Sequence, residues 1–208
     1  MLRLIEKDIR FNWKWALLLA AVAVVVPIVV RMDPGETRVI LPVYVIGTVL
    51  ANSHLVSRAC YLEDGAQTRR FLASLPVTRT QLVLSKYALG LLCAGVSIGL
   101  TSLSAFALGL RPSARGVAIA LICLLPYYAV FLGVYFRANY GSAEKAHAAL
   151  SMLTVLSAVL VGRGGVPLDG MAMHPAVLPL GVGMGLLAFA ASAGLSLRAS
   201  GRFLNGRG

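Results

Sequence analysis

The sequence is poor in charged residues, and acidic residues are the rarest of them. Only 13% of its 208 residues are charged, whereas an ordinary soluble domain carries about 25%. Just 8 Asp and Glu stand against 19 Lys and Arg. With 58% hydrophobic residues and a mean hydropathy of +0.81, this composition excludes an ordinary soluble domain and indicates a polytopic membrane protein.

Cysteine is scarce, and the phosphate-binding loop of ATP-hydrolysing proteins is missing. Cys60, Cys93 and Cys123 are far apart and show no CxxC spacing, which favours a packing role over a disulfide or metal framework. The three histidines have no carboxylate at ligand spacing, so we expect no metal site. The chain also lacks the phosphate-binding loop GxxxxGK[ST]. We therefore expect no catalytic residue and no cofactor on this chain.

Apolar runs dominate the rest of the sequence. A transmembrane helix needs about 20 apolar residues, within a range of about 17–25. The third apolar run, at about residues 81–110, is longer than a helix needs to be to cross a bilayer. We predict an all-α polytopic membrane protein, with residues 1–208 forming a single transmembrane domain of six spans at about 13–30, 39–56, 81–110, 117–136, 146–162 and 175–197.

The positive charges predict the orientation of the chain. With the N-terminus in the cytosol, 14 of the Lys and Arg residues lie inside and 5 outside, so both termini are expected to be cytoplasmic. The Lys and Arg residues cluster at the ends of apolar runs, where they can contact anionic lipid headgroups. They form no basic stripe interleaved with aromatic residues, so nucleic acid is not an expected partner. Residues 1–12 place Leu2, Ile5 and Ile9 at helical spacing, which predicts an interfacial helix.

The only long polar segment, residues 61–76, follows the second apolar run. Asp64 and the glycine after it can open a helix, and Pro76 ends it. Thr78 and Gln81 then form the pattern of a capping box, which starts the next helix. A short surface helix that ends directly before a long one is typical of a docking element for a soluble partner. In the later loop 137–147, we expect Ser142 to cap the fifth span.

An acidic residue after the second span, then Ser74-Leu-Pro-Val-Thr-Arg79 and Val83-Leu-Ser-Lys-Tyr87, resembles the permease subunits of type 2 ABC transporters. The similarity is closest to small six-span bacterial exporters. It implies a permease in the bacterial plasma membrane, and a coupling helix that docks on a separate ATP-binding subunit carrying ATP and Mg. The implied ATPase contacts are Glu63, Asp64, Arg69, Arg70, Phe71, Leu72 and Leu75. The implied corner and third-span anchor are Pro76, Thr78, Arg79, Gln81 and Lys86.

Simpler interpretations remain open for these residues. Arg69 and Arg70 can be ordinary topology charges, and Phe71 and Leu72 can pack against the bilayer surface. An ion-coupled secondary carrier is an alternative function, although such carriers usually place ionisable groups inside the membrane and these runs have none at their centres. An integral-membrane enzyme of lipid metabolism is a further alternative, although the carboxylates that would hold its metal are missing after Asp64.

Two glycine pairs signal close helix packing. Gly95 and Gly99 lie in the third run, and Gly181 and Gly185 lie in the sixth, each at the spacing that lets helix backbones approach. They can serve contacts within one chain or the seam with a second permease copy or paralogue. Because six spans enclose little pathway, we predict a dimer that exports an amphipathic, peptide, antibiotic or lipid-like substrate.

Overall fold

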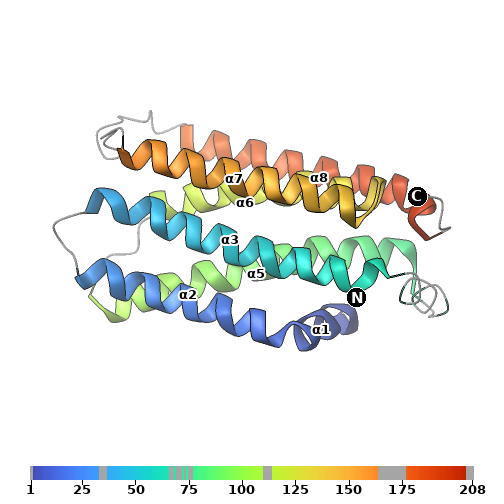
Figure 1. The fold of residues 1–208 in the computed structure, drawn as a ribbon, viewed down its shortest axis with the longest axis horizontal. Coiled ribbons are helices and arrows are strands. Elements are labelled where there is room, and N and C mark those ends of the chain that lie inside the picture. Colours follow the sequence, from blue (N-terminus) through green and yellow to red (C-terminus); the bar gives the residue numbers. More distant parts are fainter. Residues whose placement is uncertain are drawn as a thin grey trace.

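The chain is helical throughout the part that the computed structural model describes, which is residues 2–32, 37–65, 68, 72, 74, 77–109, 114–163 and 177–204. No strand occurs among these residues, so the all-α prediction is confirmed for them (Figure 1). The helices are α1 (Leu2–Phe11), α2 (Trp13–Met32), α3 (Thr37–Asp64), α5 (Arg79–Ala107), α6 (Ala114–Arg137), α7 (Tyr140–Arg163) and α8 (Val177–Leu204).

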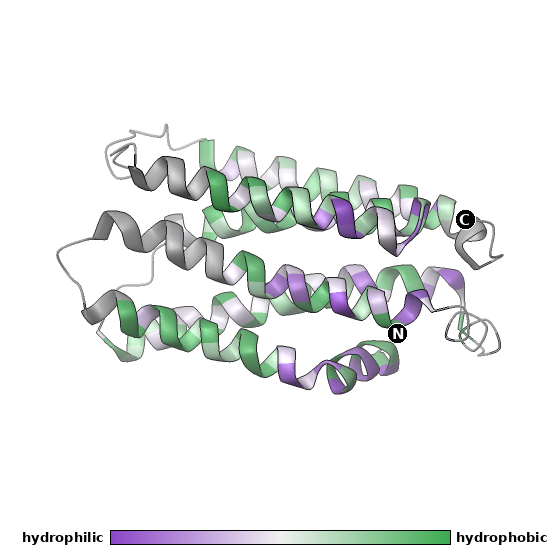
Figure 2. Cartoon of the chain, in the orientation of Figure 1, coloured by the Kyte–Doolittle hydropathy of each residue, from purple (hydrophilic) through white to green (hydrophobic). Residues whose placement is uncertain are grey.

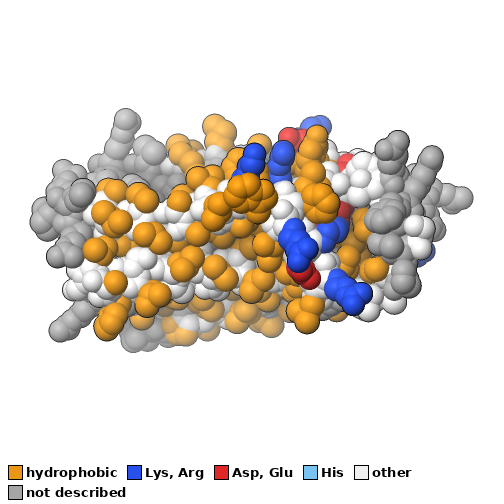
Figure 3. Space-filling model, turned by 90° about the horizontal axis from the view of Figure 1, so that it is seen from below, with side chains coloured by type: hydrophobic (Ala, Val, Ile, Leu, Met, Phe, Trp, Pro, Cys, Tyr) orange, Lys and Arg blue, Asp and Glu red, His pale blue; other side chains and the backbone are white. Residues whose placement is uncertain are grey.

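The long helices lie side by side in an elongated bundle, and α1 turns away from α2 by 82° (Figure 1). The helix α1, the last turns of α8, the end of α3 and the start of α5 all lie at one end of the bundle, which we call the polar end. Hydrophilic residues gather there, whereas the rest of the ribbon is mostly hydrophobic (Figure 2). In the face shown in Figure 3, the Lys, Arg, Asp and Glu side chains also gather toward this end. A polar end and a mostly hydrophobic length are the distribution expected of a helical bundle that crosses a membrane.

Within the described residues, three helical segments are long and apolar enough to cross a membrane: Arg79–Ala107, Gly116–Arg137 and Val177–Ala199. A fourth is added when α1 and Trp13–Val29 are counted as one bent span. The helices therefore support a multi-pass membrane protein. The count of six spans stays a prediction, as does the division of the chain into domains.

The core is centred on α6, which carries a run of large buried side chains. Tyr128, Phe131 and Tyr135 on this helix are at most 1% exposed, and they pack against α3, α5 and α8. Gly185 lets α8 come close to α6, because an added Cβ would lie 3.2 Å from Leu125 Cβ. A second cluster joins α1, α2, α3 and α5 at the other side of the bundle.

The ends of two helices follow their capping residues. Gln81 N–H donates to Thr78 Oγ1 (3.2 Å) and Thr78 N–H donates to Gln81 Oε1 (3.1 Å), so the predicted capping box opens α5. At its other end, Gly109 takes a φ of +75°, a conformation that glycine adopts at no steric cost.

The helix α7 begins earlier than predicted, and its cap is a different residue. Ser142 does not cap it. Instead, Ser142 N–H donates to the side chain of Asn139 (2.8 Å), directly before the first residue, Tyr140. Asn is among the best N-cap residues because its side-chain oxygen accepts from the third helical N–H, so the helix gains a turn and a half over the predicted 146–162 run.

Candidate functional site

A cluster of four charges, three of them buried and the fourth half-buried, joins three helices at the polar end. We call it the charge cluster; its members are Lys7 and Asp8 on α1, Glu63 near the end of α3 and Lys86 on α5. Lys86 is 0% exposed, Glu63 is 2% and Asp8 is 3%. Charged residues are almost never this deeply buried unless they are paired.

Lys86 is the centre of the charge cluster. Its Nζ donates to Asp8 Oδ2 at 2.7 Å and lies 3.0 Å from Glu63 Oε2. It also donates to the carbonyl of Ala59 at 3.3 Å. Lys7 Nζ lies 2.5 Å from Glu63 Oε1 and 3.5 Å from Asp8 Oδ1. Both carboxylates are thus shared between two ammonium groups, and α1, α3 and α5 are tied together through Lys86.

The position of Asp8 depends on the bend after α1. Leu4, Ile5 and Asp8 are the buried residues of this helix, and they share one face because residues three and four apart are neighbours on a helix. At the bend, Asn12 is 2% exposed and its Nδ2 donates to the carbonyl of Asp8 at 2.8 Å. The backbone N–H of Asn12 donates to the same carbonyl at 3.1 Å, so Asn12 holds the end of α1 through two bonds. The bend thereby turns Asp8 toward α5.

The electrostatics of the charge cluster are balanced. Two carboxylates face two ammonium groups, so its formal charge is zero when all four are ionised. Burial raises the pKa of Asp8, while the ammonium of Lys86 lowers it. Removing one partner from a buried ion pair costs about 3–5 kcal/mol, because the remaining charge is left without compensation. A substitution that removes one member of the cluster is therefore expected to loosen the joint between α1, α3 and α5.

The structure places two of the implied ATPase contacts inside the chain. Glu63 faces Lys86, and Leu72 is 6% exposed and belongs to the core around α6. Asp64 is half-buried, and Thr78, Arg79 and Gln81 are exposed beside the start of α5. The docking role of all these residues stays a prediction. Five further implied residues lie outside the described part of the chain: Arg69, Arg70, Phe71, Leu75 and Pro76.

The two glycine pairs separate into different environments. An added Cβ at Gly181 would lie 2.8 Å from Ile122 Cδ1, so Gly181 and Gly185 both serve the contact of α8 with α6. At Gly95 and Gly99 an added Cβ would meet nothing within 4 Å, and both residues are exposed on α5. The pair in α8 is thus used within the chain, while the pair in α5 faces outward.

Sequence reasoning missed Asp8 and did not foresee the partners of Lys86. A signal was present, because Asp8 falls on the face of the first helix that also carries Leu4 and Ile5, where an acidic residue needs a partner. Which cation would meet it could not be read from the sequence, since the three helices are joined only in the folded chain. Within the described residues, no group of three or more His, Cys, Asp and Glu could hold a metal ion.

Comparison with known proteins finds one family. The family described as ABC-2 family transporter protein matches residues 3–199, which is nearly the whole chain. No curated protein and no solved structure matches the sequence.

Proposed function

Because the chain belongs to the ABC-2 family of transporter proteins, we propose that it is the membrane permease subunit of an ATP-driven exporter. In this proposal, ATP binding and hydrolysis take place on a separate ATP-binding subunit, which docks on the 61–76 segment. The observation that carries the proposal is the family match over residues 3–199. The capping box that restarts the chain at Thr78 adds support, because a sharp corner between docking segment and span is what force transmission needs.

The charge cluster links the helices on both sides of this corner to α1. The 61–76 segment joins the end of α3 to the start of α5, so a push on it acts on both helices. Lys86 lies two turns into α5 and ties that helix to Glu63 and Asp8. We infer that α1, α3 and the start of α5 move as one unit when the ATP-binding subunits close.

The rest of the proposal concerns the assembly. Six spans place both termini on the cytoplasmic side, the side of the polar end, with α1 in the membrane interface. A second permease copy or paralogue completes the pathway, and of the two predicted glycine pairs, the outward-facing pair of Gly95 and Gly99 on α5 is the one left for such a seam. The bacterial plasma membrane is the expected location. The substrate class is amphipathic, which covers lipid-like, peptide and antibiotic molecules.

Co-purification tests the docking partner. The detergent-solubilised chain is purified with the ATP-binding proteins encoded beside its own gene, and the variant Arg69→Glu/Arg70→Glu is compared with wild type. We expect wild type to retain one ATP-binding protein and the variant to lose it, because reversed charges repel a surface that matches the native ones. Leu72 is unsuitable for this test, since a charge placed in the core would disturb folding itself.

The matched control is Arg198→Glu, which reverses an exposed charge on α8 and should leave retention unchanged. Equal retention by wild type and Arg69→Glu/Arg70→Glu would place the docking surface elsewhere. An absence of any ATP-binding protein from wild type would instead favour a carrier that works without one.

A further inference from the structure

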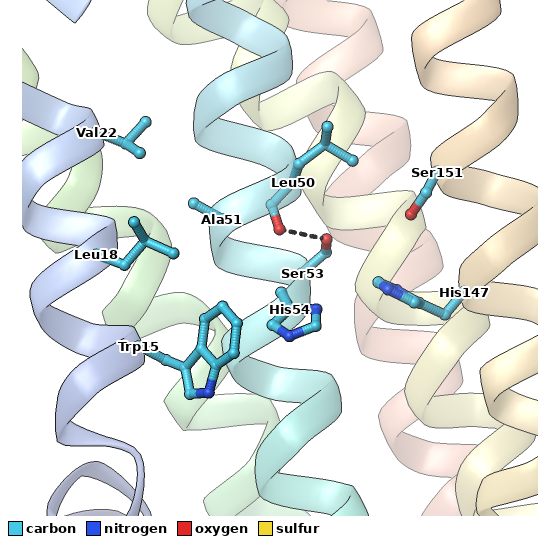
Figure 4. Close-up of a pocket in the computed structure, with 9 residues that line it drawn as sticks. All are labelled: Trp15, Leu18, Val22, Leu50, Ala51, Ser53, His54, His147 and Ser151. Carbon is cyan, nitrogen blue, oxygen red and sulfur yellow. Dashed lines mark hydrogen bonds between the residues drawn. The ribbon is translucent and has the colours of Figure 1, made fainter. Parts of the chain in front are cut away.

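A pocket of about 430 Å³ lies between α2, α3 and α7, and none of the charge-cluster residues lines it (Figure 4). Small-molecule sites commonly measure about 300–1,000 Å³. Its lining comes from three helices: Trp15, Leu18 and Val22 on α2, Leu50, Ala51, Ser53 and His54 on α3, and His147 and Ser151 on α7. Leu18 is 46% exposed and His54 is also exposed, so the pocket opens on the side of the bundle.

The lining changes from polar to apolar along the bundle. Trp15, His54 and His147 lie together near the polar end, whereas Val22 and Leu50 lie deeper in the bundle (Figure 4). At about 1.5 Å per helical residue, Trp15 and Val22 are roughly 10 Å apart along α2. If the bundle crosses a membrane, this order is that of one lipid leaflet, with its headgroups toward the polar end and its chains toward the bilayer centre.

Aromatic contacts hold the polar part of the pocket in shape. The ring centroids of Trp15 and His54 are 4.2 Å apart, and those of His54 and His147 are 6.3 Å apart. The hydroxyl of Tyr127 on α6 bonds to His147 Nδ1, which fixes the imidazole and leaves Nε2 as the nitrogen available to a ligand. Four helices thus position these rings.

One polar atom of the lining has no bond within the chain. Ser151 Oγ is buried and has no hydrogen-bond partner, and Figure 4 shows this hydroxyl pointing from α7 toward the pocket. By contrast, Ser53 Oγ donates to the carbonyl of Leu50 at 2.8 Å. A buried hydroxyl without a partner costs free energy, and a bound ligand would supply the missing bond.

The polar groups of the lining select the kind of ligand. The lining contains no carboxylate and offers N–H and O–H donors from Trp15, His54, His147 and Ser151. Arg58 lies one turn from His54 on the same face of α3, and Glu144 lies one turn from His147 on α7. The excess of donors within the lining favours a ligand that presents acceptor oxygens, such as a phosphate.

We propose that this pocket binds an anionic phospholipid of the surrounding leaflet, with its phosphate at the two imidazoles and the upper part of one acyl chain along Leu18, Val22 and Leu50. The site deepens the proposed function, since it names an anionic lipid as the substrate class and the α2–α7 side of the bundle as its entry. The role of this lipid as a substrate rests on the proposed function, whereas its binding to the pocket does not, because binding needs no ATP-binding subunit.

Native mass spectrometry of the purified chain tests the proposal. The full-length chain is titrated in detergent with phosphatidylglycerol and, separately, with phosphatidylcholine. We expect wild type to retain phosphatidylglycerol and to bind phosphatidylcholine more weakly. Ser151→Phe fills the pocket without removing any bond within the chain, and should abolish the phosphatidylglycerol adduct. The matched control is Met152→Phe, the same change at a neighbouring residue that is 73% exposed, and should bind as wild type does.

His54→Leu provides a second reading if Ser151→Phe does not fold. His54 is exposed, so its loss leaves the core intact, and losing one hydrogen bond to a charged group should weaken phosphatidylglycerol binding roughly tenfold. Equal phosphatidylglycerol binding by wild type and both variants would overturn the site. Equal binding of the two lipids by wild type would overturn the anionic preference. If the co-purification above succeeds while binding here fails, only the lipid site is refuted.

Discussion

Replacing Lys86 with Met removes the centre of the charge cluster while keeping a side chain of similar length. Asp8 and Glu63 then share only Lys7, and the formal charge of the cluster falls from zero to −1. Breaking a buried ion pair in this way costs about 3–5 kcal/mol. Because every 1.4 kcal/mol is a factor of ten in an equilibrium constant, opening of the joint between α1, α3 and α5 should increase roughly 100-fold or more.

The thiol of Cys60 reports this opening. Cys60 is 0% exposed and lies three residues before Glu63, on the same side of α3. The rate of maleimide labelling at Cys60, read from its peptide by mass spectrometry, should rise roughly 100-fold or more in Lys86→Met. Arg10→Met is the control, because it breaks an exposed pair with Glu6 that contributes at most about 0.5 kcal/mol.

The three buried members of the cluster can also be replaced together, leaving only Lys7, whose side chain is 32% exposed. The triple variant Asp8→Leu, Glu63→Met and Lys86→Met leaves no buried charge to compensate, and apolar replacements of this kind are often neutral or stabilising. Its Cys60 should therefore be labelled nearly as slowly as in wild type. Slow labelling in Lys86→Met alone would refute the argument, and so would equally fast labelling in the single and triple variants.

Gly185→Leu should destabilise the chain by at least about 1–3 kcal/mol, because even a Cβ at this position meets Leu125 Cβ at 3.2 Å. Gly183→Leu, where a Cβ meets nothing within 4 Å, is the control in a thermal-unfolding measurement in detergent, and equal losses would argue against close α6–α8 packing. Thr78→Ala should cost about 0.5–2 kcal/mol by removing the cap of α5, with faster hydrogen exchange in its first turn. Thr80→Ala, a change that leaves the capping box intact, should exchange as wild type does, and identical exchange in Thr78→Ala would count against the cap.

Local features of this chain could be predicted from its sequence, whereas contacts between helices could not. The capping box at Thr78 and the first helix follow from residues that lie within four positions of each other. The meeting of Lys86 with Asp8 spans 78 positions and depends on the 82° bend. His54 and His147 likewise looked isolated in the sequence and come together only because α3 packs beside α7.

The start of α7 also differs from the sequence prediction. Apolar periodicity alone begins at residue 146, because the residues before it are polar. The helix nevertheless starts at Tyr140, since Asn139 caps it and its first turns need not lie in an apolar environment. The sequence prediction named only Ser142 as the cap, because it placed the start of the helix at the start of the apolar run.

The bend at Asn12 connects the charge cluster with the pocket between α2, α3 and α7. On one side of the bend is α1, which is held to α5 by the ion pair of Asp8 with Lys86. On the other side of the bend is α2, whose first turn contains Trp15, a residue that lines the pocket. The backbone N–H of Trp15 donates to the Asn12 carbonyl at 2.9 Å. Spin labels at Leu2 and Met152 should change their separation when ATP is added to the assembled transporter, and an unchanged distance would rule out this linkage. If an ATP-binding subunit pushes on the segment before α5, as proposed above, that movement would reach the pocket through the bend and α2.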